Sequence, residues 1–229
     1  MKEYSKLEGI YKDSPLVVVG NGPSLSDVPV ELFEKYPTMA CNSVYASGYF
    51  KDNTPDWYVI EGLGHLKTDE ERKARMPYIK KVAKNNGATL VNRRVAQHFQ
   101  HLKEVYFIDY INEKGQHYNS FQFNPFDFYG TGACVTYAML QFAHFLTEGP
   151  VLLVGIDHSF KGKDWHFFTD EEAGFESMPI QEYQKFRMRV DPKFEEVAKV
   201  FEMTDRKLIN LTPKSVAYMF TAGEYKEWI

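Results

Sequence analysis

The sequence has few of the features that mark several large classes of protein. Its 229 residues include only two cysteines, Cys41 and Cys134, and both fall in segments that we expect to be buried. Two such cysteines indicate neither the disulfide framework of a small secreted domain nor a zinc site. We therefore expect a protein of the reducing cytoplasm.

Long apolar runs and clusters of basic residues are also missing. No run approaches the roughly 20 apolar residues that span a bilayer, and we expect no transmembrane segment. The first residues, MKEYSKLEGIYKD, lack the apolar segment of a signal peptide. The net charge of −4 and the absence of a lysine or arginine cluster argue against a nucleic-acid partner.

Three motifs of nucleotide and metal chemistry are absent as well. The dinucleotide pattern G-x-G-x-x-G would need glycine at position 25, where Leu25 stands, and no G-K-[ST] tripeptide of a P-loop occurs. No D-x-D pair of carboxylates occurs either, which agrees with chemistry that needs no metal.

What the chain does contain is the stretch Leu16–Leu25, LVVVGNGPSL. The apolar run predicts a buried strand, and Pro23 suits the first position of a helical turn. Glycines at 20 and 22 let another molecule approach the backbone, and a strand that opens a helix through a glycine turn is typical of phosphate or nucleotide sites. The alternative is a tight turn without a ligand. Asn21, whose amide can donate and accept hydrogen bonds, favours binding.

The remaining pattern alternates strands with helices. This order predicts a single α/β domain over residues 1–229, with a mainly parallel sheet of about seven strands and helices on both faces. The expected strands are Leu16–Val19, Thr38–Cys41, Trp57–Ile60, Ala88–Val91, Val105–Asp109, Val151–Gly155 and Leu208–Leu211. The expected helices are Asp69–Lys84 interrupted by Pro77, Arg93–His101, Ala133–Leu146, Ile180–Thr204 with a kink or break at Pro192, and a short one after Thr212–Ser215.

Two long segments interrupt this rhythm. Residues 112–129 are polar and aromatic without a helical period, and we interpret them as a wall of the site. Residues 158–179, which contain His166, are a candidate lid.

Several candidate site residues follow the strands. Ser24 offers a hydroxyl beside backbone N–H groups, and Asn42 offers a second amide, although a turn-forming asparagine is its plainer interpretation. Thr131 and Gly132 open the apolar helix, where Thr131 would lie near the N-cap and would cap the helix or bind an anion. Asp157 and His158 follow an apolar strand, and a structural role in a turn is the alternative for Asp157.

Together these motifs resemble those of bacterial metal-independent sialyltransferases. The ordered landmarks, between residue 16 and about residue 217, are GNGPSL, Cys41-Asn42, Gly130-Thr131-Gly132, Gly155-Ile156-Asp157 and Leu211-Thr212-Pro213-Lys214-Ser215. The layout is also similar to a family that groups archaeal 6-hydroxymethylpterin pyrophosphokinases with motility accessory factors that glycosylate flagellin. GIDHSF looks closer to that second family.

The resemblance implies a Rossmann-like nucleotide-binding domain, a GT-A variant. It implies that Asn21 and Asn42 contact the nucleotide and that Thr131 holds a donor phosphate. The chain departs from the sialyltransferase pattern at Phe128, where that family has arginine, and near Glu61, where it has asparagine. That family has two tyrosines after GID, whereas His158 and Ser159 follow immediately here. No histidine follows His166, so the catalytic roles are not carried over directly.

Three hypotheses follow. The first is an inverting glycosyltransferase with a nucleotide-sugar donor, possibly a CMP-sugar, and a glycan or small-molecule acceptor. Its base would be His158 or His166, with Asp157 orienting an imidazole or the acceptor. The second is transfer of diphosphate from ATP to a pterin alcohol, with Mg²⁺ held by Glu61 and Asp157. The third is a nucleotide-binding module without catalysis. The sequence does not fix the assembly, and a homo-oligomer is compatible with it.

Overall fold

One parallel sheet organises the chain. The computed structural model describes residues 4–60, 68–110, 118–130, 134–158, 180–213, 215 and 217–229. Within these ranges eight strands pair in the order β5-β4-β3-β2-β1-β6-β7-β8, and every pair is parallel. Their bounds are β1 Leu16–Val19, β2 Thr38–Cys41, β3 Trp57–Ile60, β4 Ala88–Asn92, β5 Val105–Ile108, β6 Val151–Val154, β7 Leu208–Asn210 and β8 Thr221–Ala222.

The predicted α/β fold with a parallel sheet is therefore confirmed, with one strand more than expected. The extra strand, β8, has two residues, and both are exposed, so it carries no apolar pattern that a sequence reading could detect. The short helix that we expected after Thr212–Ser215 is wrong: described residues 217–220 form turns, and β8 follows them. A 3₁₀ helix comes later, at η6 (Tyr225–Glu227).

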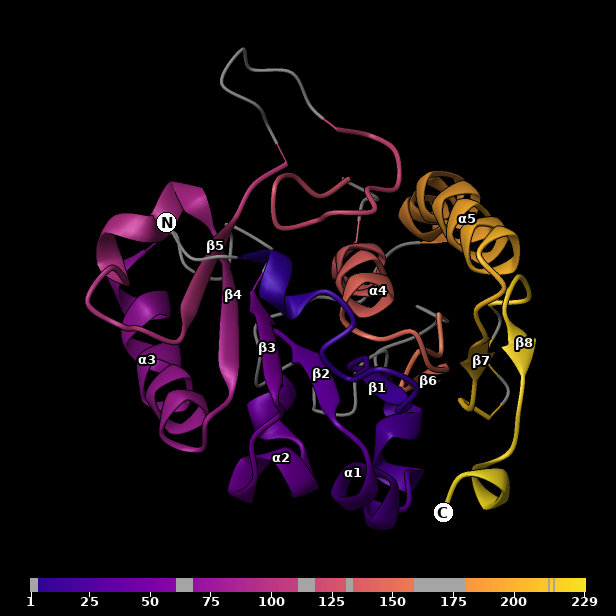
Figure 1. Cartoon of the computed structure of the whole chain (residues 1–229), viewed down its shortest axis with the longest axis horizontal. Helices are drawn as coiled ribbons and strands as arrows, with labels where there is room; N and C mark the ends of the chain where they lie inside the picture. Colours follow the sequence, from indigo (N-terminus) through magenta and orange to yellow (C-terminus); the bar gives the residue numbers. More distant parts are fainter. Residues whose placement is uncertain are drawn as a thin grey trace.

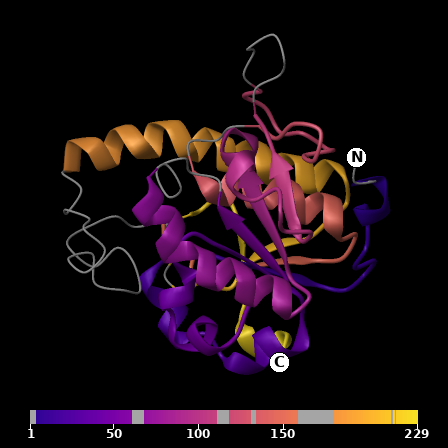
Figure 2. The same cartoon turned by 90° about the vertical axis from the view of Figure 1, so that its left-hand side faces the viewer.

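Helices cover both faces of this sheet (Figure 1). The α-helices are α1 (Val30–Lys35), α2 (Gly48–Asp52), α3 (Asp69–Lys84), α4 (Val135–Leu146) and α5 (Ile180–Met203). Shorter 3₁₀ turns are η1 (Tyr4–Leu7), η2 (Pro23–Asp27), η3 (Val44–Ala46) and η5 (Arg93–His98). Figure 2 shows α4 and α5 above the strands and the α1–α3 layer below them.

The alternation of side chains along each strand explains the two layers. In β1, Leu16 and Val18 belong to the apolar core under α4 and α5, while Val17 and Val19 belong to the core under α1, α2 and α3. Successive strand residues point to opposite faces, so a strand that is apolar throughout must be covered twice. All four residues of β1 are fully buried, as this requires.

Two prolines lie inside helices that continue through them. We expected Pro77 to interrupt its helix, but α3 runs unbroken past it, from a capping box formed by Thr68 and Glu71. A proline within a helix costs about 3 kcal/mol. The buried side chains Tyr78, Ile79 and Val82, packed against the sheet, offset this cost. Pro192 is likewise inside α5, which is the continuous helix Ile180–Met203.

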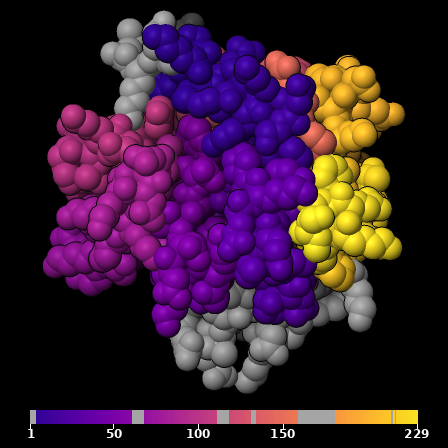
Figure 3. Space-filling model, turned by 60° about the horizontal axis from the view of Figure 1, so that its bottom comes forward, coloured from indigo at the N-terminus to yellow at the C-terminus, as the bar shows by residue number. Residues whose placement is uncertain are grey.

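The C-terminal residues pack beside the first helix of the chain (Figure 3). The backbone oxygen of Trp228 accepts hydrogen bonds from Lys35 Nζ at 2.8 Å and from the Tyr36 hydroxyl at 3.0 Å. The end of the chain is thereby tied to α1, on the face of the sheet opposite α4.

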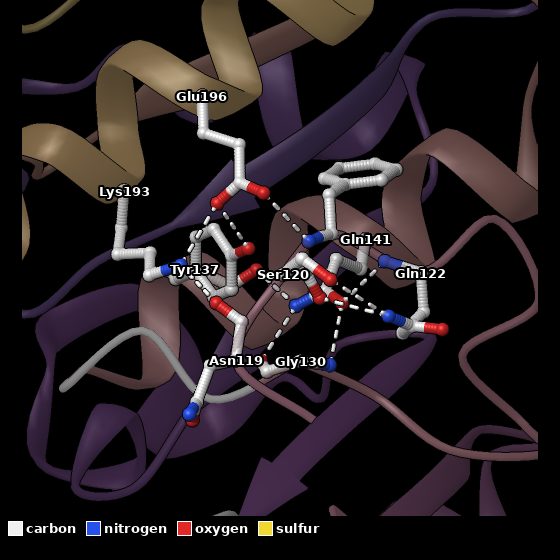
Figure 4. A network of polar contacts seen from close by, with 9 residues as sticks. Asn119, Ser120, Gln122, Gly130, Tyr137, Gln141, Lys193 and Glu196 are labelled. Carbon is white, nitrogen blue, oxygen red and sulfur yellow. Dashed lines mark hydrogen bonds and ion pairs between the residues drawn. The ribbon is translucent and has the colours of Figure 1, made fainter. Parts of the chain in front are cut away.

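A buried glutamine fixes the segment that leads into α4 (Figure 4). Gln141 Oε1 accepts from the backbone N–H of Gly130 at 2.7 Å and of Gln122 at 3.0 Å. Its Nε2 donates to the carbonyls of Gly130 at 2.9 Å and of Tyr137 at 3.1 Å. One fully buried side chain thus satisfies both backbone groups of Gly130.

Helix α5 holds the same segment from the other side. The Glu196 carboxylate accepts from the backbone N–H of Phe121 at 3.0 Å, from the Tyr137 hydroxyl at 2.8 Å and from Lys193 Nζ at 3.0 Å. Lys193 also donates to the Asn119 carbonyl. The segment that we interpreted as a wall is therefore, over its described residues 118–129, tied by hydrogen bonds to two helices.

We expect Gln141→Leu to lower the free energy of unfolding by roughly 2 kcal/mol or more, because several buried backbone groups lose their partner. Urea denaturation measures this. Gln184→Leu is the matched control, since Gln184 is exposed on α5 and should be near neutral. Equal stability of the two variants would contradict the tethering role of Gln141.

Candidate functional site

A cleft opens at the carboxyl edge of the sheet, where the strand order changes direction. From β1 the chain proceeds outward through β2 to β5 and then returns to β6 on the other side of β1. Open parallel sheets bind ligands at such a switch point. The cleft has a volume of about 190 Å³ and is lined by Gly20, Asn21, Gly22, Cys41, Asn42, Cys134, Val135, Thr136, Gly155, Ile156, Asp157, His158, Phe186 and Phe194.

The glycines after β1 are required by the protein's own backbone. A Cβ at Gly20 would lie 2.4 Å from the Gly155 carbonyl oxygen, and a Cβ at Gly22 would lie 2.7 Å from the same atom. The Gly22 Cβ would also lie 1.9 Å from Asp157 Oδ2. The loop after β6 thus occupies the space that a side chain would need at these glycines, and the expected approach of another molecule to their backbone stays a prediction.

Asp157 connects this loop to the start of η2. Its carboxylate accepts from the Ser24 hydroxyl at 2.8 Å and from the Ser24 backbone N–H at 3.3 and 3.4 Å. Burial raises the pKa of Asp157, and the hydrogen bonds from Ser24 partly oppose that rise. Ser24 is therefore engaged with Asp157, and Asp157 has the turn-capping contact that we named as its alternative role.

Two amide side chains at the cleft have polar atoms without a partner. Asn21 Nδ2 donates to the Cys41 carbonyl at 3.3 Å, which turns the side chain toward β2. Within the described part of the chain, Oδ1 of Asn21 and Oδ1 of Asn42 are buried and accept no hydrogen bond. A buried polar atom without a partner costs about 1–3 kcal/mol, so both oxygens are suited to accept from a ligand donor.

Two cleft residues also have unusual backbone conformations. Asn42 has a φ of 47° and His158 a φ of 53°, both in the left-handed region. Asparagine tolerates this region, but for other residues with a Cβ it costs about 1–2 kcal/mol. Strain of this kind gathers at functional sites, and here it aims the His158 side chain at α5.

His158 is paired with a carboxylate from α5. Its Nε2 lies 2.7 Å from Asp191 Oδ1, and Arg187 Nε donates to both oxygens of Asp191, at 2.7 and 2.8 Å. The ring is in contact with Phe194 at 5.1 Å and with Phe186 at 6.1 Å between centroids. We expected Asp157 to orient an imidazole or the acceptor. The carboxylate that contacts the His158 imidazole is Asp191, and a role of Asp157 toward the acceptor stays a prediction.

The balance of burial, hydrogen bonds and charge lowers the pKa of both members of this pair. Burial lowers the pKa of His158, the hydrogen bond from its ring to Asp191 opposes this, and the charge of Arg187 lowers it further. Burial alone would raise the pKa of Asp191, but hydrogen bonds from Arg187 and His158 outweigh it and the pKa falls below its usual value. At pH 7 we therefore expect a neutral imidazole beside an ionised carboxylate.

The loop after β6 has a further anchor at the Thr212–Ser215 landmark, to which the sequence alone assigned no role in the site. The Thr212 hydroxyl accepts from the Ile156 backbone N–H at 3.0 Å, and the Ser215 hydroxyl donates to the Ile156 carbonyl at 2.6 Å. The Thr212–Ser215 landmark therefore has a structural function, since it fixes the residue just before Asp157.

The structure gathers part of the predicted set in one place. Gly20, Asn21, Gly22, Asn42, Asp157 and His158 line the cleft, and Ser24 adjoins it through Asp157. Whether they bind a ligand stays a prediction. The other candidates, Glu61, Thr131, Gly132 and His166, and with them most of the candidate lid 158–179, lie outside the described residues.

The N-terminus of α4 also faces the cleft. The helix begins at Val135 with Cys134 as its N-cap, two residues later than expected, and Cys134 makes no side-chain cap bond. Thr131 is thus three residues before the N-cap. Val135 and Thr136 line the cleft, so the positive end of the helix dipole lies beside it.

Neither a metal cluster nor a membrane helix is found in the described ranges. They contain no group of three or more histidine, cysteine, aspartate or glutamate side chains placed to hold a metal ion. In the same ranges, none of the helices combines the length and the apolar character needed to cross a bilayer.

Comparison with known proteins finds similarity at the level of structure. No family model matches the sequence, and no curated protein matches it. The monofunctional α-2,3-sialyltransferase Cst-I from Campylobacter jejuni is 14% identical, with a TM-score of 0.55 over 91% of this chain and 79% of that one. A variant of the sialyltransferase Cst-II in complex with CMP is 12% identical, with a TM-score of 0.54 over 91% and 85%. These likenesses show that the chain has the sialyltransferase-like, Rossmann-like GT-A variant fold.

We expect Gly22→Ala to lower the free energy of unfolding by about 1–3 kcal/mol, because the added methyl group overlaps the loop after β6. Thermal and urea denaturation measure this. Gly48→Ala is the matched control: a Cβ there has no atom within 4 Å, and Gly48 begins α2, so stability should hold or rise. A tolerated Gly22→Ala would show that the two loops are not in close contact.

Proposed function

We propose that this protein is a glycosyltransferase that moves a sugar from a nucleotide-sugar donor, with a CMP-sugar as the first candidate, to an acceptor hydroxyl. The single observation that carries the proposal is the cleft at the switch point, with two unpaired amide oxygens and a helix N-terminus at its edge. The fold adds support, because one of its structural neighbours is a sialyltransferase in complex with CMP.

The nucleotide is proposed to bind at Asn21 and Asn42. Each amide has a buried oxygen that accepts no hydrogen bond in the described structure. The exocyclic amine of a cytosine would supply N–H donors to such oxygens, whereas the carbonyl oxygen of a uracil at that position would not.

The phosphate of the donor is proposed to bind at the start of α4. Unpaired N–H groups and the helix dipole favour an anion at the first turn of a helix. Gly130, held on both backbone groups by Gln141, leads directly into Thr131 and Gly132, which we propose as donor-phosphate contacts.

The transfer itself is proposed to be a single displacement with inversion. The acceptor oxygen forms a bond to the anomeric carbon while the bond from that carbon to the phosphate oxygen breaks. The leaving nucleotide keeps the electron pair, and the acceptor proton passes to His158 or His166. The leaving charge would be stabilised by Thr131 and the α4 N–H groups, without a metal. No observation favours the alternative of diphosphate transfer from ATP.

A thermal-shift screen of CMP, UDP, GDP and ATP, each with and without Mg²⁺, tests this proposal. A ligand that binds only the folded state must raise the melting temperature. We expect CMP to give the largest rise, unchanged by Mg²⁺. A rise with ATP that depends on Mg²⁺ would contradict the proposal and favour diphosphate transfer.

We expect Asn21→Ala to weaken CMP binding about fivefold, since one hydrogen bond to the ligand contributes roughly 1 kcal/mol. Isothermal calorimetry measures the dissociation constant, and circular dichroism checks that the fold is kept. Asn124→Ala is the control, because Asn124 is exposed, bonds to Asp127 and does not line the cleft. Unchanged affinity in Asn21→Ala would remove Asn21 from the site.

A further inference from the structure

One face of α5 carries a chain of polar contacts that ends at His158. Tyr183, Arg187 and Asp191 are spaced four residues apart, which places them one above the other on the helix. Arg187 Nη1 donates to the Tyr183 hydroxyl at 3.1 Å, and Arg187 Nη2 lies 2.7 Å from Asp191 Oδ2. Arg187 Nε also donates to Asp191 Oδ2. The Asp191 carboxylate is therefore held in one orientation toward the His158 ring.

The chemistry of this pair fixes where the ring proton lies. An ionised carboxylate accepts hydrogen bonds and donates none, so His158 Nε2 must carry the hydrogen of the 2.7 Å contact. In a neutral imidazole one nitrogen carries the hydrogen and the other carries a lone pair. The lone pair is therefore on Nδ1.

The packing around the His158 ring prevents a ring flip that would exchange the positions of Nδ1 and Nε2. The His158 side chain is 3% exposed, and Phe186 and Phe194 pack against it. Its backbone is in the left-handed region, and the preceding residues are bonded to η2 and to the loop after β7. The orientation of the ring is thus set before any ligand enters the cleft.

From this geometry we propose that Asp191, braced by Arg187, is a positioning residue that holds His158 as the Nε2–H tautomer, so that Nδ1 is the atom that receives the acceptor proton. This inference rests on the proposed function and takes His158, one of its two candidate bases, as the base. When Nδ1 takes the proton, both ring nitrogens carry hydrogen, and the new positive charge forms next to the Asp191 carboxylate.

Asp191 and Arg187 have opposite effects on the pKa of His158. Asp191 and Arg187 face the ring from α5, and Asp157 precedes it on its own loop. Asp191 favours the protonated ring and Arg187 disfavours it, while burial lowers the pKa of His158 most. A base acts in its unprotonated form, so its pKa sets the acidic limb of kcat against pH.

The first experiment measures kcat against pH for Asp191→Asn and Arg187→Gln, with CMP-sugar as donor. Asp191→Asn should lower kcat at least tenfold, because the amide accepts either tautomer, and should move the acidic limb to lower pH. Arg187→Gln should move that limb to higher pH. Glu182→Gln is the control, since it removes a carboxylate from the exposed Lys185 pair of α5 and should change neither. Shifts in the same direction, or none, would overturn the inference.

The second experiment needs no turnover. Long-range ¹H–¹⁵N correlation spectra of the imidazoles report which nitrogen carries the hydrogen, and His158→Gln assigns the signal among the seven histidines of the chain. We expect the Nε2–H tautomer in the unaltered protein and a mixture in Asp191→Asn. An Nδ1–H tautomer in the unaltered protein would overturn the inference even if the variants fail to fold.

The failures of the two proposals can be told apart. If His158→Gln abolishes turnover while Asp191→Asn and Arg187→Gln leave kcat and the acidic limb unchanged, the positioning role is wrong and the glycosyltransferase stands. If His158→Gln keeps its turnover, the base is not His158 and the inference falls. If no nucleotide sugar is consumed at all, the proposed function falls, and the spectra still decide the tautomer.

Discussion

The close approach of two loops is the constraint on which the rest of the site depends. Strands β1 and β6 pair in parallel from Leu16 with Val151 to Val19 with Val154, so the chains that leave them meet at the same edge. They meet without space for side chains: the Gly22 N–H donates to the Gly155 carbonyl at 2.8 Å, and Gly155 itself has a φ of 64°. A Cβ at Gly20, Gly22 or Gly155 would lie within 2.8 Å of a backbone oxygen of the other loop, so the loops could not keep this close contact.

The three residues after Gly155 are each hydrogen-bonded to a different part of the chain. Ile156 is bonded through both backbone groups to the hydroxyls of Thr212 and Ser215. Asp157 is bonded to Ser24 at the start of η2, and His158 to Asp191 on α5. Because consecutive residues are each restrained, the described start of this loop, residues 155–158, is held in place, as a site that must be preorganised requires.

The sequence predicts the sheet well and the long-range pairing poorly, for one physical reason. Runs such as Leu16–Val19 are apolar throughout because two helix layers cover them, and this signal is local. The contact of His158 with Asp191 joins residues 33 positions apart, and in the sequence Asp191 is only one polar residue of an amphipathic helix. Local patterns also predicted that Pro77 interrupts its helix, whereas packing against the sheet keeps α3 continuous. They gave no signal for the two exposed residues of β8.

The polar groups of the cleft differ in what a ligand can add to them. Asp157 and Ser24 already satisfy one another, so a ligand that competed for them would break bonds as it formed new ones. The Oδ1 atoms of Asn21 and Asn42 have no described partner. A hydrogen bond from a ligand would remove the free-energy cost of leaving these buried oxygens unpaired. Binding energy is therefore expected at the two asparagines, while Asp157 fixes the loop. His158, whose Nε2 is bonded to Asp191, lines the same cleft and stays the predicted base.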